Sequence, residues 1–144
     1  DQSINRRQLR AFIFSDARAK QALEDILHPV IHTELVARSA LSQSNYCILA
    51  IPLLAESKIA YPLNRILAIG APPKLQLQRL CKRDDLSVNT AQAMIDQQSP
   101  WAEKAAFADD IIRNDQSIDQ LKNQIINLHQ HYLQLAKKAA VVAS

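Results

Sequence analysis

Two uninterrupted apolar runs lie between stretches of helical periodicity in this 144-residue chain. The longer run, from Tyr46 to Leu53, has no charged residue and no glycine, and it contains two isoleucines. A short apolar run between polar turn residues is typical of a strand that is buried on both faces of a parallel sheet. We therefore predict a central strand over 46–53. A buried helical segment is the alternative, which Pro52 and the isoleucines disfavour.

Two further segments are predicted to be strands. The second is expected over Arg65 to Gly70, which contains the other apolar run and leads through two prolines into a helix from Lys74 to about Arg83. A third, short strand is expected over 110–113. Apolar rather than alternating strands, in the order strand, connection, strand and helix, favour a parallel sheet. The predicted fold class is therefore α/β, with helices flanking a parallel sheet.

The first third of the chain is predicted to be helical. Apolar residues with helical spacing cover 6–13, and Asp16 suits the N-cap of a second helix. We expect that second helix to end at His28, because a proline disfavours the α conformation in the residue before it. Pro29 would then begin a third helix, so that three helices precede the first strand.

Capping signals also predict the helices of the second half. Ser87 suits the N-cap of a polar helix, and Ser99 with Pro100 suits the start of another short one. Ser117 and Gln120 have the spacing of a capping box, which is followed by a long amphipathic pattern. A long C-terminal helix that packs on the sheet is therefore expected.

Glycine occurs once in the sequence, at Gly70. Loops that bind phosphate use several glycines so that backbone N–H groups can approach the ligand. Neither GxxxxGK[ST] nor GxGxxG can be written in this sequence. A phosphate loop of the usual kind is thus excluded within these residues.

Charge and cysteine content narrow the class of protein. With 17 basic and 14 acidic residues, the net charge of +3 is far from that of a dedicated nucleic-acid-binding protein. Cys47 and Cys81 lie far apart and are expected to be buried free thiols in a reducing compartment. No run reaches the roughly 18 apolar residues of a membrane span, and the N-terminus is unlike a signal peptide. We expect a cytoplasmic protein that binds neither membranes nor nucleic acid.

Two histidine pairs are candidates for metal binding, His28 with His32 and His129 with His131. Neither pair has the spacing of a known class of metal site, so we expect no metal site. His28 is instead a candidate for fixing a helix break or contacting a ligand.

Three cations share one face of the helix predicted over 74–83. Arg79, Lys82 and Arg83 have the spacing i, i+3 and i+4. A solvated helix face is one interpretation. The other is an anion clamp, because forked guanidinium groups suit phosphate oxygens. The residues alone leave both open.

The order of motifs along the chain resembles that of the dephospho-coenzyme A kinase family, which catalyses the last step of coenzyme A synthesis. The resemblance covers almost the whole length, in order and with sensible spacing. It is carried by the segments INRRQLRAFIFSD, LHPVI, PLLAES, RILAIGAPPKLQLQRLCKRDDLS, ADDIIRN and LHQHYLQLA.

The resemblance implies a P-loop kinase that uses ATP with Mg²⁺ to phosphorylate the ribose 3′-hydroxyl of dephospho-coenzyme A, with no tightly bound cofactor. It implies a helical coenzyme A domain over 4–45, the remainder of the nucleotide-binding α/β core over 46–83 and 109–144, and a lid over 84–108. Arg79 and Arg83 would be the catalytic arginines that close on ATP phosphates, and Asn114 would lie near the adenine. The substrate-binding residues would be His28, Pro52, Leu53, Leu54 and Glu56.

The chain departs from the family at its start. Family members begin with a strand, a P-loop and a helix, followed by an aspartate that acts as base, whereas only five residues precede Arg6 here. A βαβ unit needs about 30 residues. We therefore expect the chain as given to be a partial core that is inactive alone, with possible self-association through an exposed sheet edge.

A competing hypothesis is a non-catalytic helical adaptor or a weak nucleic-acid binder. Such a protein would expose the cluster of Arg6, Arg7 and Arg10 together with that of Arg79, Lys82 and Arg83. An all-helical adaptor has no use for buried strands, so the strands distinguish the two hypotheses.

Overall fold

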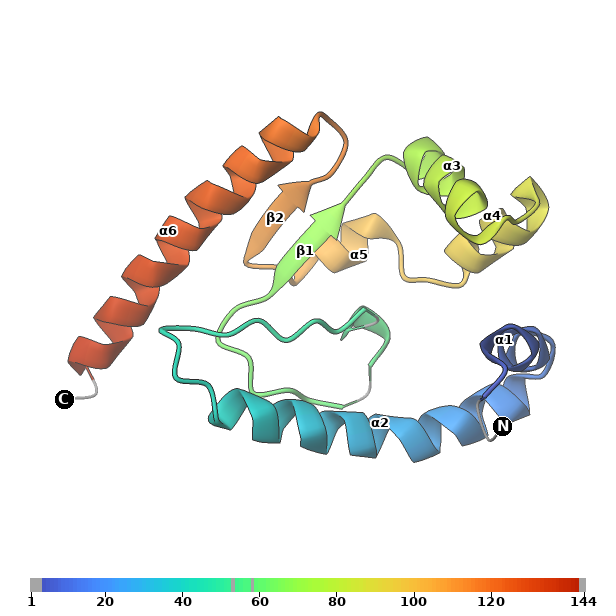
Figure 1. The fold of residues 1–144 in the computed structure, drawn as a ribbon, viewed down its shortest axis with the longest axis horizontal. Helices are drawn as coiled ribbons and strands as arrows, with labels where there is room; N and C mark the ends of the chain where they lie inside the picture. The colour runs from blue at the N-terminus through green and yellow to red at the C-terminus, as the bar shows by residue number, and fades with distance from the viewer. Residues whose placement is uncertain (1–3, 53, 58, 143–144) are drawn as a thin grey trace. The chain divides into compact units, whose positions relative to one another are not determined.

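The structure is a computed structural model that describes residues 4–52, 54–57 and 59–142 (Figure 1). It divides into two units, one that ends at Ser42 and one that begins at Gln43. The first unit contains α1 (Arg6–Ser15) and α2 (Ala17–Ala40). The second contains, in order, the short 3₁₀ helix η1 (Leu54–Glu56), β1 (Leu67–Gly70), α3 (Pro73–Asp84), α4 (Val88–Asp96), α5 (Trp101–Ala106), β2 (Asp110–Arg113) and α6 (Ile118–Val142).

The two helices of the first unit begin at side-chain caps. Asn5 Oδ1 accepts a hydrogen bond of 3.1 Å from the backbone N–H of Gln8 at the start of α1. Asp16 Oδ1 accepts from the N–H groups of Arg18 and Ala19 at 2.8 and 3.1 Å. These bonds satisfy N–H groups that have no partner inside a helix, and the prediction of Asp16 as an N-cap is confirmed.

Pro29 does not end a helix. The prediction of a break between His28 and Pro29 is wrong, because α2 runs through both residues for 24 residues. A proline removes one N–H donor, but a long helix keeps its hydrogen bonds on both sides of that position. Thr33 Oγ1 also donates to the Pro29 carbonyl at 2.9 Å. Residues 4–45 therefore contain two α-helices, where three were expected.

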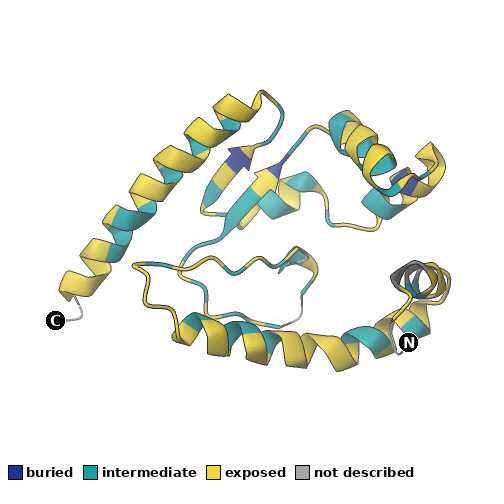
Figure 2. Ribbon diagram, viewed as in Figure 1, coloured by how far each residue is buried: buried dark blue, intermediate teal, exposed yellow. Residues whose placement is uncertain are grey.

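The sheet that the structure describes consists of β1 and β2 in parallel. Leu67 is in register with Asp110, and Gly70 with Arg113. The predictions of strands over 65–70 and 110–113 are confirmed. Ile112 is 4% exposed and forms part of the small core, while most of the surrounding surface is only half-buried or exposed (Figure 2).

The segment 46–52 is not a strand, so the prediction of a central strand there is wrong for its described residues. It is irregular, and Ile48 is 68% exposed. An apolar run indicates that a segment is suited to burial, but a strand forms only where a neighbouring backbone accepts its hydrogen bonds. No such pairing occurs for 46–52 within the described residues. Leu53, the last residue of the run, lies outside the described residues.

The helices around the sheet begin and end where the capping signals predict. Ser87 accepts from the N–H of Thr90 at 3.2 Å and caps α4. Asp85 ends α3 in the left-handed conformation, with φ 52°, which aspartate tolerates better than most residues. Ser117 and Gln120 form the expected reciprocal capping box at the start of α6, with bonds of 3.1 and 3.3 Å.

The side-chain amide of Gln124 fastens α6 to the outer edge of β2. Its Nε2 donates to the Arg113 carbonyl at 2.9 Å, and its Oε1 accepts from the Arg113 N–H at 3.0 Å. Gln124 thus makes the two hydrogen bonds that a further strand would make at this residue.

The cysteines differ in part from the expectation. Neither forms a disulfide, but Cys47 is exposed and only Cys81 is half-buried. The prediction of burial is wrong for Cys47, because it depended on a strand over 46–53. Across residues 4–52, 54–57 and 59–142, no helix is long and apolar enough to cross a lipid bilayer.

Candidate functional site

The carboxyl ends of β1 and β2 meet at one edge of the sheet, which is where ligands bind in open α/β sheets. The backbone N–H of Asn114, the first residue after β2, donates to the carbonyl of Gly70 at 2.8 Å. This bond extends the ladder by one residue. Gly70 and Asn114 therefore mark the point from which the loops to α3 and α6 depart.

The loop after β1 holds the start of α3 close to this strand end. Pro72 and Pro73 preset the backbone for the first turn of the helix. Gln76 Nε2 donates to the Ala71 carbonyl at 2.6 Å, and the N–H of Leu75 donates to the carbonyl of Pro72 at 2.9 Å. The helix that carries the candidate arginines is thus fixed to β1 by local hydrogen bonds.

Arg79, which was expected to close on ATP phosphates, and Asn114, which was expected near the adenine, are in direct contact. Arg79 Nη1 donates to the main-chain carbonyl of Asn114 at 2.8 Å. Arg79 is exposed and Asn114 is half-buried. One guanidinium N–H is used by this bond, and the rest of the five-donor fork remains at the carboxyl end of β2.

Arg83 lies one turn further along α3 and is paired with its neighbour. Its Nε and Nη2 donate to the two carboxylate oxygens of Asp84 at 2.9 and 3.2 Å. The hydrogen bond and the charge of Asp84 raise the pKa of Arg83. The Arg83 side chain is 72% exposed, whereas that of Asp84 is 14% exposed, so the guanidinium is accessible to another anion from its solvent side.

Glu56 does not project freely toward a substrate. Its Oε1 accepts from the backbone N–H of Ser99 at 2.8 Å and lies 3.7 Å from Lys104 Nζ. Burial raises the pKa of the Glu56 carboxyl, but the N–H groups of Ser99 and of Glu56 itself and the charge of Lys104 outweigh burial and lower it. The carboxylate therefore joins η1 to the turn between α4 and α5.

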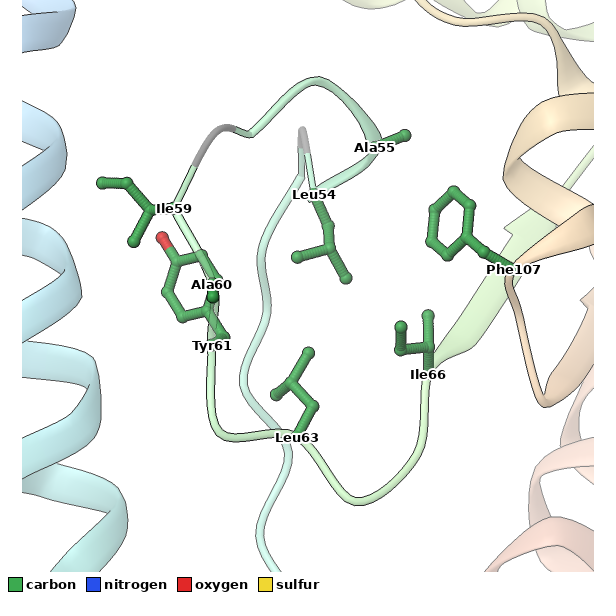
Figure 3. Close-up of a pocket in the computed structure, with 8 residues that line it drawn as sticks. All are labelled: Leu54, Ala55, Ile59, Ala60, Tyr61, Leu63, Ile66 and Phe107. Atoms are coloured by element: carbon green, nitrogen blue, oxygen red, sulfur yellow. The ribbon is translucent and has the colours of Figure 1, made fainter.

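Leu54 faces an apolar pocket of about 370 Å³ within the second unit (Figure 3). The pocket lies between the segment that follows η1 and the end of α5. Its volume is within the range of small-molecule sites. It is lined by Leu54, Ala55, Ile59, Ala60, Tyr61, Leu63, Ile66 and Phe107.

The remaining predicted substrate residues are not gathered at this pocket. Pro52 is exposed, and Leu53 lies outside the described residues. His28 is exposed on α2, in the other unit. The side chains of Arg6, Arg7 and Arg10, the first cluster of the alternative hypothesis, also lie outside the description.

A polar cluster that the sequence did not predict lies at the start of β2. Arg65 Nε and the hydroxyl of Tyr132 both donate to Asp110 Oδ2 at 2.9 Å. Arg65 lowers the pKa of Asp110 despite partial burial, and burial together with Asp110 raises the pKa of Tyr132 to about 12. The ring of Tyr46 packs edge-on against Tyr132 at 5.4 Å, and its hydroxyl lies 2.6 Å from His129 Nδ1. These residues lie far apart in sequence and show no common spacing.

Comparison with known proteins decides the family. The sequence profile described as "Dephospho-CoA kinase" matches residues 1–120. The chain is 42% identical to the dephospho-CoA kinase of Coxiella burnetii over 135 residues, covering 93% of this chain and 68% of that protein. The chain belongs to the dephospho-CoA kinase family. It is also 38% identical to the dephospho-CoA kinase of Aeromonas hydrophila over 141 residues, covering 97% of this chain and 69% of the relative.

Solved structures agree with this membership. The dephospho-CoA kinase of Campylobacter jejuni matches with a TM-score of 0.62 and 30% identity, over 93% of this chain and 68% of that one. A Thermus thermophilus protein matches with a TM-score of 0.72 and 28% identity, over 88% and 66%. The fold is therefore α/β of the P-loop kinase type, with helices flanking a parallel sheet. The chain is that of a kinase, and the adaptor hypothesis is not favoured.

Proposed function

We propose that this protein transfers the γ-phosphoryl group of ATP to the ribose 3′-hydroxyl of dephospho-CoA, the last step of coenzyme A biosynthesis. The new bond joins the 3′-oxygen to the γ-phosphorus, while the bond from that phosphorus to the β–γ bridging oxygen breaks. ADP leaves with the bridging oxygen, and the proton of the 3′-hydroxyl is released to solvent. The observation that carries the proposal is the Arg79–Asn114 contact, which joins a cationic helix to the carboxyl end of β2.

The two arginines have different roles in this proposal. Arg79 lies against the chain at the end of β2, so it supports the nucleotide near Asn114 on the adenine side. Arg83 lies four residues further along α3 and exchanges Asp84 for phosphate oxygens as charge develops during transfer. Phosphoryl transfer depends on positioning and on neutralising charge, which forked guanidinium groups do well.

The acceptor binds on the side of η1 in this proposal. Leu54 and the apolar pocket behind it support this, because dephospho-CoA carries a long, weakly polar arm. On the strength of the sequence resemblance, the proposal also assigns His28, Pro52 and Leu53 to the binding of dephospho-CoA. In domain terms, 4–45 bind the coenzyme A portion, 46–83 and 109–144 form the nucleotide core, and 84–108 form a lid.

Mg²⁺ would enter with ATP. Among the described residues, no group of three or more His, Cys, Asp or Glu side chains is placed to hold a metal ion. Mg²⁺ commonly keeps several waters and binds through substrate phosphates, so its binding through the nucleotide suits this donor set. ATP as phosphoryl donor also supports a cytoplasmic location.

The test uses the natural gene product that contains this chain. ADP formation is followed with dephospho-CoA as acceptor, and the product is identified by mass. The matched control acceptor is a 3′-deoxyribose analogue of dephospho-CoA, which lacks only the reacting oxygen. We expect ADP formation and a phosphorylated product with dephospho-CoA, and neither with the analogue. Equal turnover of the two acceptors, or none with either, would overturn the proposal.

A further inference from the structure

The turn 97–101, which connects α4 to α5 and includes Trp101 as the first residue of α5, is held at two points within the second unit. At the first, the N–H of Ser99 donates to Glu56 Oε1 at 2.8 Å, across 43 residues of sequence. At the second, the indole ring of Trp101 lies directly against Gly70 at the end of β1. The turn is thus pinned between η1 and the strand end where the candidate site begins.

Lys104 reinforces the first of these points. Its Nζ lies 3.7 Å from Glu56 Oε1 and donates to Gln98 Oε1 at 3.0 Å. The side chains of Glu56 and Lys104 are 26% and 24% exposed, so water competes with the pair less than at a free surface. One carboxylate oxygen therefore accepts a backbone hydrogen bond and faces a cation, both from the proposed lid segment.

The turn matters for the arginines because of how α3 and α4 are tethered. These two helices pack on each other, and the pair is connected to the rest of the unit at two points. One end is the loop from β1 into α3, and the other is the turn 97–101. Fixing the second tether therefore restricts how α3, with Arg83 near its carboxyl end, moves relative to η1.

We propose that Glu56 is a positioning residue that latches the base of the lid to η1, and that it does not bind substrate directly. This inference rests on the proposed function. The latch sets the distance between the acceptor side at Leu54 and the phosphate side at Arg83. It departs from the assignment of Glu56 by family resemblance, because the carboxylate is already engaged by Ser99 and Lys104.

Trp101 makes the latch measurable. It is the single tryptophan in the sequence, and it lies two residues from Ser99. Acrylamide quenching of its fluorescence reports how well the turn is held, without any ligand. The variants are Glu56→Ala, which removes both contacts, and Glu56→Gln, which keeps an oxygen that can accept from the Ser99 N–H. The control is Asp119→Ala, which removes the exposed Lys122–Asp119 pair on α6.

We expect Glu56→Ala to increase quenching of Trp101 and to lower kcat by up to about 100-fold, as a small misplacement of reacting groups does. Glu56→Gln should recover most of both, and Asp119→Ala should match the wild type. Thermal unfolding separates loss of the latch from loss of the fold, and Glu56→Gln keeps the test valid if Glu56→Ala does not fold.

Two results would overturn the latch. One is unchanged quenching in Glu56→Ala together with a higher KM for dephospho-CoA alone, which would make Glu56 a substrate ligand. The other is wild-type quenching and kinetics in both variants. Absence of kinase activity in the wild-type protein would instead overturn the proposed function, and the Trp101 measurement would still decide whether the turn is held by Glu56.

Discussion

Trp101 lies so close to Gly70 that a Cβ atom at residue 70 would be 2.5 Å from Cη2 of the indole ring. Side-chain atoms do not approach each other this closely, so the ring occupies the space that any other residue would need. The single glycine of the sequence is thus explained by packing at the strand end, without a positive φ angle.

The first prediction is that Gly70→Ala lowers the free energy of unfolding by about 1–3 kcal/mol, the usual range for overpacking. The Trp101 ring must move away, which also disturbs the turn 97–101. Urea unfolding of Gly70→Ala, Trp101→Leu and the double variant measures the coupling. Additive effects in the double variant would show that the two residues do not interact.

The second prediction concerns the arginines of α3. Arg83→Ala should lower kcat/KM by about 100-fold or more, as for a lost group that stabilises transition-state charge. Arg79→Ala should act mainly on KM for ATP, because its guanidinium is held at Asn114. Lysine at either position should recover only part, because a point charge does not reproduce the fork.

The matched control is Lys122→Ala, which removes an exposed cation paired with Asp119 on α6. Its steady-state constants should equal those of the wild type. If both α3 variants behave like this control, Arg79 and Arg83 are merely surface charges.

The third prediction is that Asp84→Asn raises kcat/KM. Asp84 holds both Nε and Nη2 of Arg83, and an incoming phosphate must replace it. The Arg83 side chain is 72% exposed and that of Asp84 is 14% exposed, so solvent screens the pair mainly on the arginine side. A contribution of about 1 kcal/mol from such a pair would set the gain at about fivefold. The gain should shrink as ionic strength rises, because salt weakens the pair in the wild type as well. A loss of activity with an intact fold would mean that Asp84 assists Arg83.

The fourth prediction is a pH dependence of stability from the Tyr132–Asp110 bond. The folded pKa of Tyr132 is raised to about 12, above its ordinary value of 10.0, so the folded state holds this proton more tightly than the unfolded state. The resulting stability is present below pH 10 and is lost as the pH rises toward 12.

Thermal unfolding from pH 8 to pH 12 in wild type and Tyr132→Phe tests this. Tyr132→Phe should be less stable at pH 8, because the hydrogen bond is lost, and its midpoint should fall less between pH 10 and 12. Asp110 has the opposite effect on the pH dependence of stability. The pKa of Asp110 is lower in the folded state, so this group stabilises the protein at pH values above its ordinary pKa of 3.8. That stabilisation is lost as the pH falls through the folded pKa. Parallel curves for the two proteins would contradict the assignment.

Local signals in the sequence predicted much of the fold. Asp16, Ser87 and Ser117 cap helices because a short polar side chain can reach N–H groups within three residues of itself. The strands over 65–70 and 110–113 were predicted correctly because both segments are largely apolar and each has the other as its pairing partner. The segment 46–52 has an equally apolar sequence, but pairing depends on which backbone lies beside it.

The candidate site was predicted only in part, for the same reason. Arg79 and Arg83 could be selected by their spacing on one helix, yet the partner of each depends on tertiary placement. Glu56 was selected as a substrate residue, and its contact with Ser99 crosses 43 residues that carry no shared motif. The cluster of Arg65, Asp110 and Tyr132 likewise has no sequence signature, because its members lie before β1, at the start of β2 and on α6.

The Gln124–Arg113 pair has a consequence for the solution behaviour of the protein. A free strand edge can pair with a strand from another molecule. On the outer side of β2, the N–H and the carbonyl of Arg113 are already hydrogen-bonded to the side chain of Gln124, which cannot continue a sheet. The C-terminal helix α6 therefore hinders the pairing of this edge with a strand of another molecule. A Gln124→Ala variant would leave one N–H and one carbonyl of β2 open to a neighbouring chain, and light scattering on concentration would reveal the loss of that protection.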